Sequence, residues 1–381
     1  MTKGEPMAVL DSLERVQSLD SRNVFRLLHD MPEHCETALA IGRSLAVERF
    51  AIKPNVLLLV GVGDSGFAAD VVAEVLADDV EVPVLTEHTA TIPACVNEQS
   101  VVFIIDYLGN TPTSLRAYKA AQERGAHVVC VTSGGKLRES AAGSARVLSI
   151  PAGQPSRFGL VYMALAPIAA AQAMGLASTS DQKASAAILL AKNAREFLRF
   201  EVPTARNQAK QVAEMLFGKV PVVIGGSDYR ALVGRRWVSE ISANAKQCAL
   251  TCSFNDLADG QVCAWEQLAS DTCEPAFVYL VDELDWTTEN ETIRQASSEV
   301  LSKFTRIDLE MKGANNAERL IYGMYFGDYV SYYLALLREV DPYKTESARS
   351  IASRLAPRET ATATSAVIEK EAGEETTADE I

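Results

Sequence analysis

A buried strand, a glycine-rich turn and a helix follow one another twice in the first 125 residues, which directs the chain toward an α/β fold. Residues 56–60 are apolar and precede the turn GVGDSG, and residues 101–105 are apolar and precede DYLGNT. The free backbone N–H groups and the helix dipole at such a turn attract an anion. Yet Asp64 and Asp106 stand in these two turns, and a carboxylate repels phosphate. The sequence thus combines the backbone of an anion site with side chains that oppose an anion.

Composition favours a large globular chain with small-molecule or protein partners. The 381 residues, 48% of them hydrophobic, are enough for two domains. The formal net charge of −14 disfavours nucleic acid and anionic membrane surfaces. There is no basic and then apolar N-terminal segment, and no apolar run long enough to cross a bilayer, so we expect a cytoplasmic protein.

The cysteines do not predict a metal site. None of the seven belongs to a C-x-x-C pair. The four between Cys248 and Cys273 fit no usual zinc spacing, and no histidine lies near them. We therefore expect buried free thiols in a reducing compartment, with neither a metal nor a cofactor.

Strands alternate with helices along most of the chain. The strands are apolar on both sides, which predicts parallel sheets covered by helices. The predicted strands are 56–60, 82–86, 101–105, 127–132, 146–150, 220–224, 248–254, 276–281 and 304–310. The main predicted helices are 65–78, 111–124, 136–142, 158–174, 180–217 with a break near Pro203, 229–246, 289–302 and 315–339.

Four regions follow from this pattern. An N-terminal helical segment covers 1–50, and two α/β domains cover 51–178 and 179–356. Because a strand, a glycine turn and a helix begin both halves, we expect duplicated domains that pack through their sheet ends. Residues 357–381 form an acidic tail that lacks aromatic residues, and we expect it to be disordered.

Six sequence blocks in order resemble the bifunctional phosphoglucose/phosphomannose isomerase family, which is built from two sugar isomerase (SIS) domains. GVGDSG resembles the family's GMGGSG, DYLGNT resembles SYSGNT, and TSGGKL at 132–137 is identical to the family's block. The remaining blocks are PAGQPSR at 151–157, the R-W and N-A-K of 236–246, and GDYVSYYLA with VDP at 327–342. The resemblance implies two SIS domains, a homodimer with sites between domains and subunits, and aldose–ketose isomerisation of hexose 6-phosphates.

The resemblance also implies a set of site residues. Gly63, Ser65, Thr111, Ser133 and Lys136 fall on the phosphate-binding blocks. Ser65 and Thr111 are equally well interpreted as helix N-caps, and Lys136 as a solvated lysine. Arg157 matches an arginine that would stabilise the enediolate, with a surface salt bridge as the alternative.

The sequence departs from the family at the positions that bind phosphate and transfer protons. Asp64 replaces a glycine, and Asp106 and Leu108 replace two phosphate-binding serines. We interpret Asp106 as a cap of its own turn, at the expense of the phosphate site. Ala243 stands where the family has the glutamate that moves the proton, and Asp259 stands where it has the ring-opening histidine. No histidine follows residue 127.

These departures leave three functional hypotheses. We favour a catalytically degenerate family member that binds a sugar phosphate or another carbohydrate derivative. An active isomerase with relocated residues is the second, because Glu240 lies one helical turn before Ala243 and should face a similar direction. A structural or regulatory partner of an enzyme in hexose-phosphate metabolism is the third. The tyrosines of 322–333 should be core and interface residues.

Overall fold

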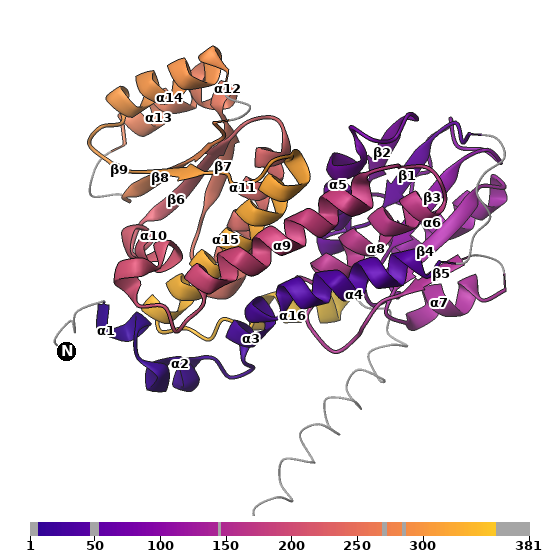
Figure 1. Cartoon of the computed structure of the whole chain (residues 1–381), viewed down its shortest axis with the longest axis horizontal. Coiled ribbons are helices and arrows are strands. Elements are labelled where there is room, and N and C mark those ends of the chain that lie inside the picture. Colours follow the sequence, from indigo (N-terminus) through magenta and orange to yellow (C-terminus); the bar gives the residue numbers. More distant parts are fainter. Residues whose placement is uncertain (1–6, 46–52, 144–145, 269–272, 284–286, 356–381) are drawn as a thin grey trace, which may run out of the picture.

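The computed structural model describes residues 7–45, 53–143, 146–268, 273–283 and 287–355 (Figure 1). The acidic tail at 357–381 lies outside the described residues, so its expected disorder stays a prediction.

The first half forms a five-stranded parallel sheet with the order β2-β1-β3-β4-β5. Its strands are β1 (Leu57–Val60), β2 (Val84–Glu87), β3 (Val101–Ile105), β4 (His127–Thr132) and β5 (Arg146–Ser149). Its helices are α5 (Asp64–Leu76), α6 (Pro112–Glu123), α7 (Gly135–Ala141) and α8 (Leu160–Ala173). The strand order reverses between β1 and β3, and such a switch point is where open α/β sheets bind ligands.

The second half forms a four-stranded parallel sheet with the order β7-β6-β8-β9. Its strands are β6 (Val220–Gly225), β7 (Leu250–Ser253), β8 (Pro275–Val281) and β9 (Thr305–Glu310). Both sheets carry strands at every predicted place, and the α/β class is confirmed. The β6–β8 switch point of this sheet corresponds to the β1–β3 switch point of the first.

Long helices lie beside and between the two sheets (Figure 1). Before and between the sheets come α1 (Met7–Leu10), α2 (Leu13–Leu19), α3 (Val24–His29), α4 (Met31–Arg43), α9 (Ser180–Leu198) and α10 (Gln208–Leu216). Later helices are α11 (Tyr229–Glu240), α12 (Phe254–Asp256), α13 (Val262–Glu266), α14 (Thr288–Val300), α15 (Asn316–Leu337) and α16 (Glu346–Leu355). Two π-helices, Ile241–Ala245 and Leu257–Gln261, were not predicted.

One continuous core joins both sheets, so the expectation that they pack through their sheet ends was wrong. Leu57 and Leu59 on β1 and Val223 on β6 belong to the same hydrophobic cluster. The cluster runs through α4, α8, α9 and α15, which occupy the space between the sheets (Figure 1). Helix α15 is apolar around its circumference, as a helix enclosed on all sides should be, and its tyrosines are buried as predicted.

Two glycines let α11 and α15 approach closely. A Cβ atom at Gly327 would lie 2.2 Å from Nε1 of Trp237, and one at Gly323 would lie 3.0 Å from the methyl groups of Val233. The indole N–H of Trp237 donates to the Gly323 carbonyl at 3.0 Å. This contact fixes α11, which carries the candidate site, against the core.

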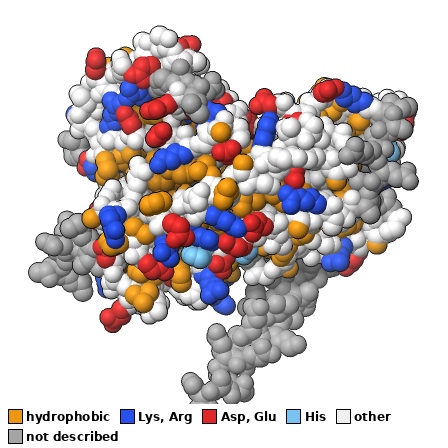
Figure 2. Space-filling view, in the orientation of Figure 1, with side chains coloured by type: hydrophobic (Ala, Val, Ile, Leu, Met, Phe, Trp, Pro, Cys, Tyr) orange, Lys and Arg blue, Asp and Glu red, His pale blue; other side chains and the backbone are white. Residues whose placement is uncertain are grey.

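Charge is mixed over the surface. Figure 2 shows acidic and basic side chains interspersed on one face of the described chain, without the basic stripe that marks a nucleic-acid interface.

Candidate functional site

The two glycine turns of the first sheet meet at the β1–β3 switch point. The backbone N–H of Tyr107 donates to Oγ of Ser65 at 3.3 Å, and that hydroxyl also lies 3.2 Å from Sδ of Met163. Gly63, with φ of +60°, is the N-cap of α5, while Thr111 is the N-cap of α6 but makes no capping bond through its side chain. Thr111 is therefore an N-cap as predicted, although its side chain makes no capping bond, whereas Ser65 lies inside α5 and its interpretation as an N-cap was wrong.

Asp106 occupies the anion position of the second turn. Its carboxylate is buried and accepts hydrogen bonds from the backbone N–H groups of Gly109 at 3.0 Å and Thr111 at 2.8 Å. Free N–H groups of this kind are what a bound phosphate would use. The turn is thus capped by its own carboxylate, as the sequence predicted.

The other residues of these turns bond mainly within the protein. Asp64 accepts a hydrogen bond from the Ser156 hydroxyl, and Ser133 donates to the Tyr107 carbonyl at 2.6 Å. Leu108 is 63% exposed, and the side chain of Lys136 is exposed as a solvated lysine should be. The turns therefore present two carboxylates and an apolar side chain in a place suited to an anion.

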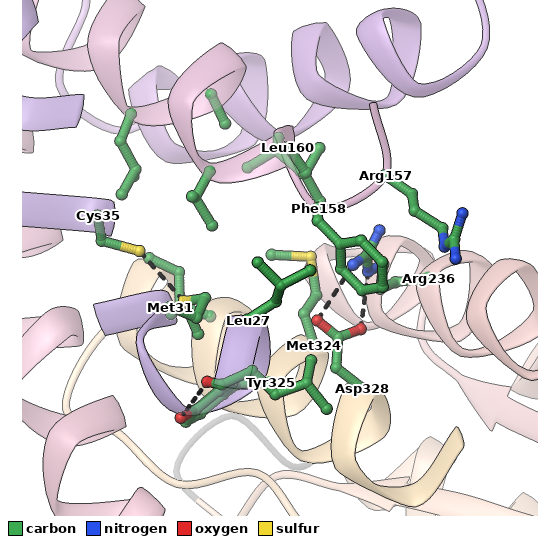
Figure 3. A pocket seen from close by; sticks show the side chains of 16 residues that line it. Leu27, Met31, Cys35, Arg157, Phe158, Leu160, Arg236, Met324, Tyr325 and Asp328 are labelled. Atoms are coloured by element: carbon green, nitrogen blue, oxygen red, sulfur yellow. Dashed lines mark hydrogen bonds and ion pairs between the residues drawn. The ribbon is translucent and has the colours of Figure 1, made fainter. Parts of the chain in front are cut away.

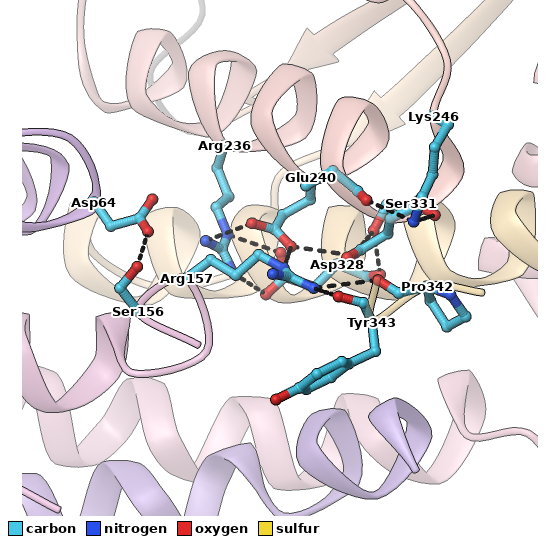
Figure 4. A network of polar contacts seen from close by, with 12 residues as sticks. Asp64, Ser156, Arg157, Arg236, Glu240, Lys246, Asp328, Ser331, Pro342 and Tyr343 are labelled. Atoms are coloured by element: carbon cyan, nitrogen blue, oxygen red, sulfur yellow. Dashed lines mark hydrogen bonds and ion pairs between the residues drawn. The ribbon is translucent and has the colours of Figure 1, made fainter. Parts of the chain in front are cut away.

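Arg157 is buried between the two halves of the chain, so a surface salt bridge was the wrong alternative. Its Nη2 donates to the carbonyls of Pro342 at 3.2 Å and Tyr343 at 3.0 Å (Figure 4). Its guanidinium lies over the Phe158 ring, 4.5 Å from the centroid. Burial lowers the pKa of Arg157, an effect that the nearby Glu240 carboxylate opposes.

Glu240 is completely buried in a network of four charged groups (Figure 4). Its carboxylate lies 2.9 Å from Nη1 of Arg236 and 3.9 Å from Nε of Arg157, and accepts a hydrogen bond from Asn244 at 3.0 Å. Arg236 also pairs with Asp328 at 2.8 Å. Burial raises the pKa of Glu240 to about 7 in spite of the two arginines. Two cations and two carboxyl groups thus face one another away from water.

Glu240 and Ala243 do not share a face, contrary to the sequence prediction. Ala243 lines an open cavity, whereas Glu240 has no exposed surface. The cause is the π-helix Ile241–Ala245 that begins directly after Glu240. Its i→i+5 hydrogen bonds wind the chain more loosely than an α-helix, so positions three apart no longer stack.

Two cavities lie near this network. The larger, of about 820 Å³, is lined by residues of 239–248 and 340–348, including Ala243. The smaller, of about 50 Å³, is lined by Arg157, Arg236, Asp328 and many apolar side chains (Figure 3). Since small-molecule sites usually measure about 300–1,000 Å³, only the larger can hold a sugar.

Asp259 stands apart from the network. It is exposed on the π-helix Leu257–Gln261, and no contact within the described ranges joins it to Arg157 or Glu240. Sequence reasoning also missed Arg236 and Asp328 as partners. Both lie in blocks that carried the family resemblance, and their opposite charges were the available signal.

Thiols and acids do not assemble into a metal centre among the described residues, where no group of three possible ligands was found. Cys35 and Cys130 are buried free thiols, as expected. Cys95, Cys248 and Cys263 are exposed, so that expectation was wrong for them. Cys248 precedes β7, an edge strand of the second sheet.

Comparison with known proteins covers both halves of this chain. The SIS domain family matches residues 52–177, and the bacterial phospho-glucose isomerase C-terminal SIS domain matches residues 205–355. A bifunctional phosphoglucose/phosphomannose isomerase of Caldicellulosiruptor bescii is 27% identical, over 87% of this chain and 99% of its own length. The chain is a two-SIS-domain homologue of the bifunctional phosphoglucose/phosphomannose isomerases.

Further relatives agree with this family. The bifunctional phosphoglucose/phosphomannose isomerase of Thermoplasma acidophilum is 27% identical over 78% of this chain and 89% of its own. Among solved structures, a hypothetical protein of Thermus thermophilus covers 92% of this SIS-family chain and 95% of its own, with a TM-score of 0.69 and 14% identity. A glucose-6-phosphate isomerase like protein from the same organism covers 89% and 98%, with a TM-score of 0.56 and 20% identity. Within the described residues, no helix is long and apolar enough to span a membrane.

Proposed function

We propose that this SIS-family chain binds a carbohydrate derivative and does not catalyse the aldose–ketose isomerisation of hexose 6-phosphates. The observation that carries the proposal is the methyl group of Ala243 on the wall of the open cavity, where the family has its proton-transferring glutamate. A methyl group cannot accept a proton, and a missing acid–base group usually costs about 10²–10⁴ in rate.

The capped phosphate turn supports the same proposal. The carboxylate of Asp106 already accepts hydrogen bonds from the two N–H groups that a phosphate would need, and Asp64 adds a second carboxylate in the other glycine turn. Of the predicted phosphate ligands Gly63, Ser65, Thr111, Ser133 and Lys136, we propose that none holds a phosphate dianion tightly in this chain. Arg157 then serves to join the two halves rather than to stabilise an enediolate.

An active isomerase with Glu240 as the base is the second candidate. Its support is the pKa of about 7, which suits a base near neutral pH, and the neighbouring Arg157. Against it, the carboxylate is enclosed by Arg236, Arg157 and Asn244 and has no exposed atom. A substrate would have to displace an arginine to reach it.

The remaining proposals rest on the resemblance and the composition. We propose two SIS domains at 51–178 and 179–356, a homodimer and a cytoplasmic location. A structural or regulatory partnership with an enzyme of hexose-phosphate metabolism is compatible with a chain that keeps the fold and lacks the base.

An assay of isomerase turnover distinguishes the non-catalytic binder from the isomerase with Glu240 as the base. Purified protein is assayed with fructose 6-phosphate and mannose 6-phosphate by coupled formation of glucose 6-phosphate, with the Caldicellulosiruptor bescii isomerase as positive control. We expect no measurable turnover. Rates in the usual enzymatic range of about 1–10³ per second would refute the proposal. Loss of that turnover in Glu240→Gln would then establish the second candidate.

A further inference from the structure

The cavity of about 820 Å³ is bounded by two segments far apart in the sequence. One wall is the end of α11 with the π-helix, residues 239–248, and the other is the segment 340–348 that leads into α16. Its volume lies within the range of small-molecule sites. It exceeds the small enclosed cavity beside Arg157 by more than an order of magnitude.

Unpaired hydroxyl groups are the most frequent functional group of these walls. Ser239, Ser242, Thr345 and Ser347 all line the cavity, and none of their hydroxyls bonds to another group in the described part of the chain. Each hydroxyl both donates and accepts a hydrogen bond. Val340 is the one large aliphatic side chain among the lining residues.

Two of the four charged side chains of the cavity, Lys246 and Asp341, form hydrogen bonds within the protein. The Nζ of Lys246 donates to the carbonyls of Ala243 at 2.9 Å, Asn244 at 3.0 Å and Asp341 at 2.5 Å. Asp341 accepts hydrogen bonds from Ser21 at 2.5 Å and from the N–H of Tyr343 at 2.8 Å.

Formal charges on the walls cancel. Lys246 and Lys344 are balanced by Asp341 and Glu346, and Nζ of Lys344 lies 3.9 Å from Asp341. A phosphate dianion would therefore meet no excess of positive charge here to offset the loss of its hydration. An uncharged ligand would lose less hydration free energy on entering the cavity.

The second wall is held in place from both halves of the molecule. Arg157, from the first half, donates to the carbonyls of Pro342 and Tyr343 (Figure 4). Lys246, from the second half, donates to the carbonyl of Asp341. A cavity with fixed walls binds a small ligand without the cost of ordering them.

We propose that this cavity binds an unphosphorylated, uncharged polyhydroxylated ligand, namely a free sugar or polyol. The proposal rests on the proposed function, since it takes carbohydrate binding as given, and it adds the place and the class of ligand. Hydroxyl walls match the donors and acceptors of a polyol, and the balanced charges give no preference for a phosphate ester.

Cys248 provides a direct readout, because it is exposed and lines the cavity. Full-length protein is treated with iodoacetamide, and alkylation of each cysteine is followed by peptide mass spectrometry with glucose, mannose, fructose or glucitol at millimolar concentration. At least one of these should slow alkylation of Cys248 several-fold and saturably. Cys95 and Cys263, which are exposed but lie outside the cavity lining, should react at unchanged rates.

Filling the cavity provides the matched variant. Ala243→Trp should abolish the protection of Cys248, while Ala186→Trp on the exposed face of α9 should leave it intact. If Ala243→Trp fails to fold, Ser242→Ala is used, and the sugar concentration for half protection should rise several-fold. The proposal is overturned if no free sugar or polyol protects Cys248, or if glucose 6-phosphate protects it better than glucose. Those results leave the absence of turnover intact, whereas isomerase activity would refute the proposed function itself.

Discussion

The carboxylate of Glu240 and the methyl group of Ala243 lie on different sides of one helical turn, the first enclosed in protein and the second on the wall of an open cavity. This relationship separates a buried acid whose pKa is raised to about 7 from the cavity in which a substrate has room. An isomerase base needs both a pKa near neutrality and access to the substrate. Here Glu240 has the first and the position of Ala243 has the second.

The buried carboxyl group of Glu240 should give the fold a pH-dependent stability. Burial raises its pKa from 4.5 to about 7, so the folded chain keeps the proton at pH values where the unfolded chain has lost it. Its stabilising contribution is complete below pH 4.5 and is lost as the pH rises through 7. In Glu240→Gln this loss should disappear from the free energy of unfolding, measured by urea denaturation across that range. Glu299→Gln, at an exposed acid of α14, should keep the wild-type slope.

Arg157 and Glu240 should be energetically coupled. Arg157→Met removes one of two arginines that face a buried carboxyl group and releases two carbonyls, so we expect a loss of about 3–5 kcal/mol in the free energy of unfolding. Adding Glu240→Gln should recover at least about 0.5 kcal/mol of this loss in a double-mutant cycle by urea denaturation. Strictly additive losses would mean that the two groups do not interact across their 3.9 Å separation.

Gly327→Ala should destabilise the contact of α11 with α15. The new methyl group would lie 2.2 Å from the buried Trp237 indole, whose N–H is fixed to the Gly323 carbonyl. Overpacking of this kind costs about 1–3 kcal/mol, measurable as a lower melting temperature. Gly134→Ala is the matched control, because nothing lies within 4 Å of its added Cβ atom. Equal melting temperatures for the two variants would contradict the close approach.

Rebuilding the capped turn should restore affinity for phosphate. Asp106→Ser frees the N–H groups of Gly109 and Thr111, while Leu108→Ser and Asp64→Gly add a hydroxyl and remove a second acid. New hydrogen bonds of about 0.5–1.5 kcal/mol each should tighten glucose 6-phosphate binding roughly tenfold, as measured by calorimetry.

A charge-matched control separates local from general electrostatics in that experiment. Glu123→Gln with Glu299→Gln removes the same two charges at exposed positions and should leave the affinity unchanged. If the rebuilt turn binds glucose 6-phosphate no better than wild type, the backbone of the turn is no longer that of a phosphate site.

The sequence was sufficient to predict those features that depend on residues close together in the chain. The strands were predictable because runs such as 101–105 are apolar on both faces. The capping role of Asp106 was predictable because its partners, Gly109 and Thr111, follow within five residues.

The geometry of the candidate site could not be predicted, because it depends on a π-helix and on contacts between residues far apart in the sequence. The residue types of Ile241–Ala245 do not predict a π-helix. This π-helix nevertheless places Glu240 and Ala243 on different sides of the helix. Arg157 donates to carbonyls 185 and 186 residues away, and backbone carbonyls carry no residue-type signal. The hydroxyl-lined cavity likewise exists only because 340–348 returns to 239–248.

The core that both sheets share also determines when during synthesis the chain can complete its fold. The first sheet and its helices leave the ribosome early, but α15, which packs against α9 and joins the core of both sheets, is the last long helix to emerge. Until it does, the apolar side of α9 that packs against α15 has no final covering. A nascent chain of this architecture must therefore expose that side of α9 until α15 is made, and we expect a chaperone to bind the intermediate there.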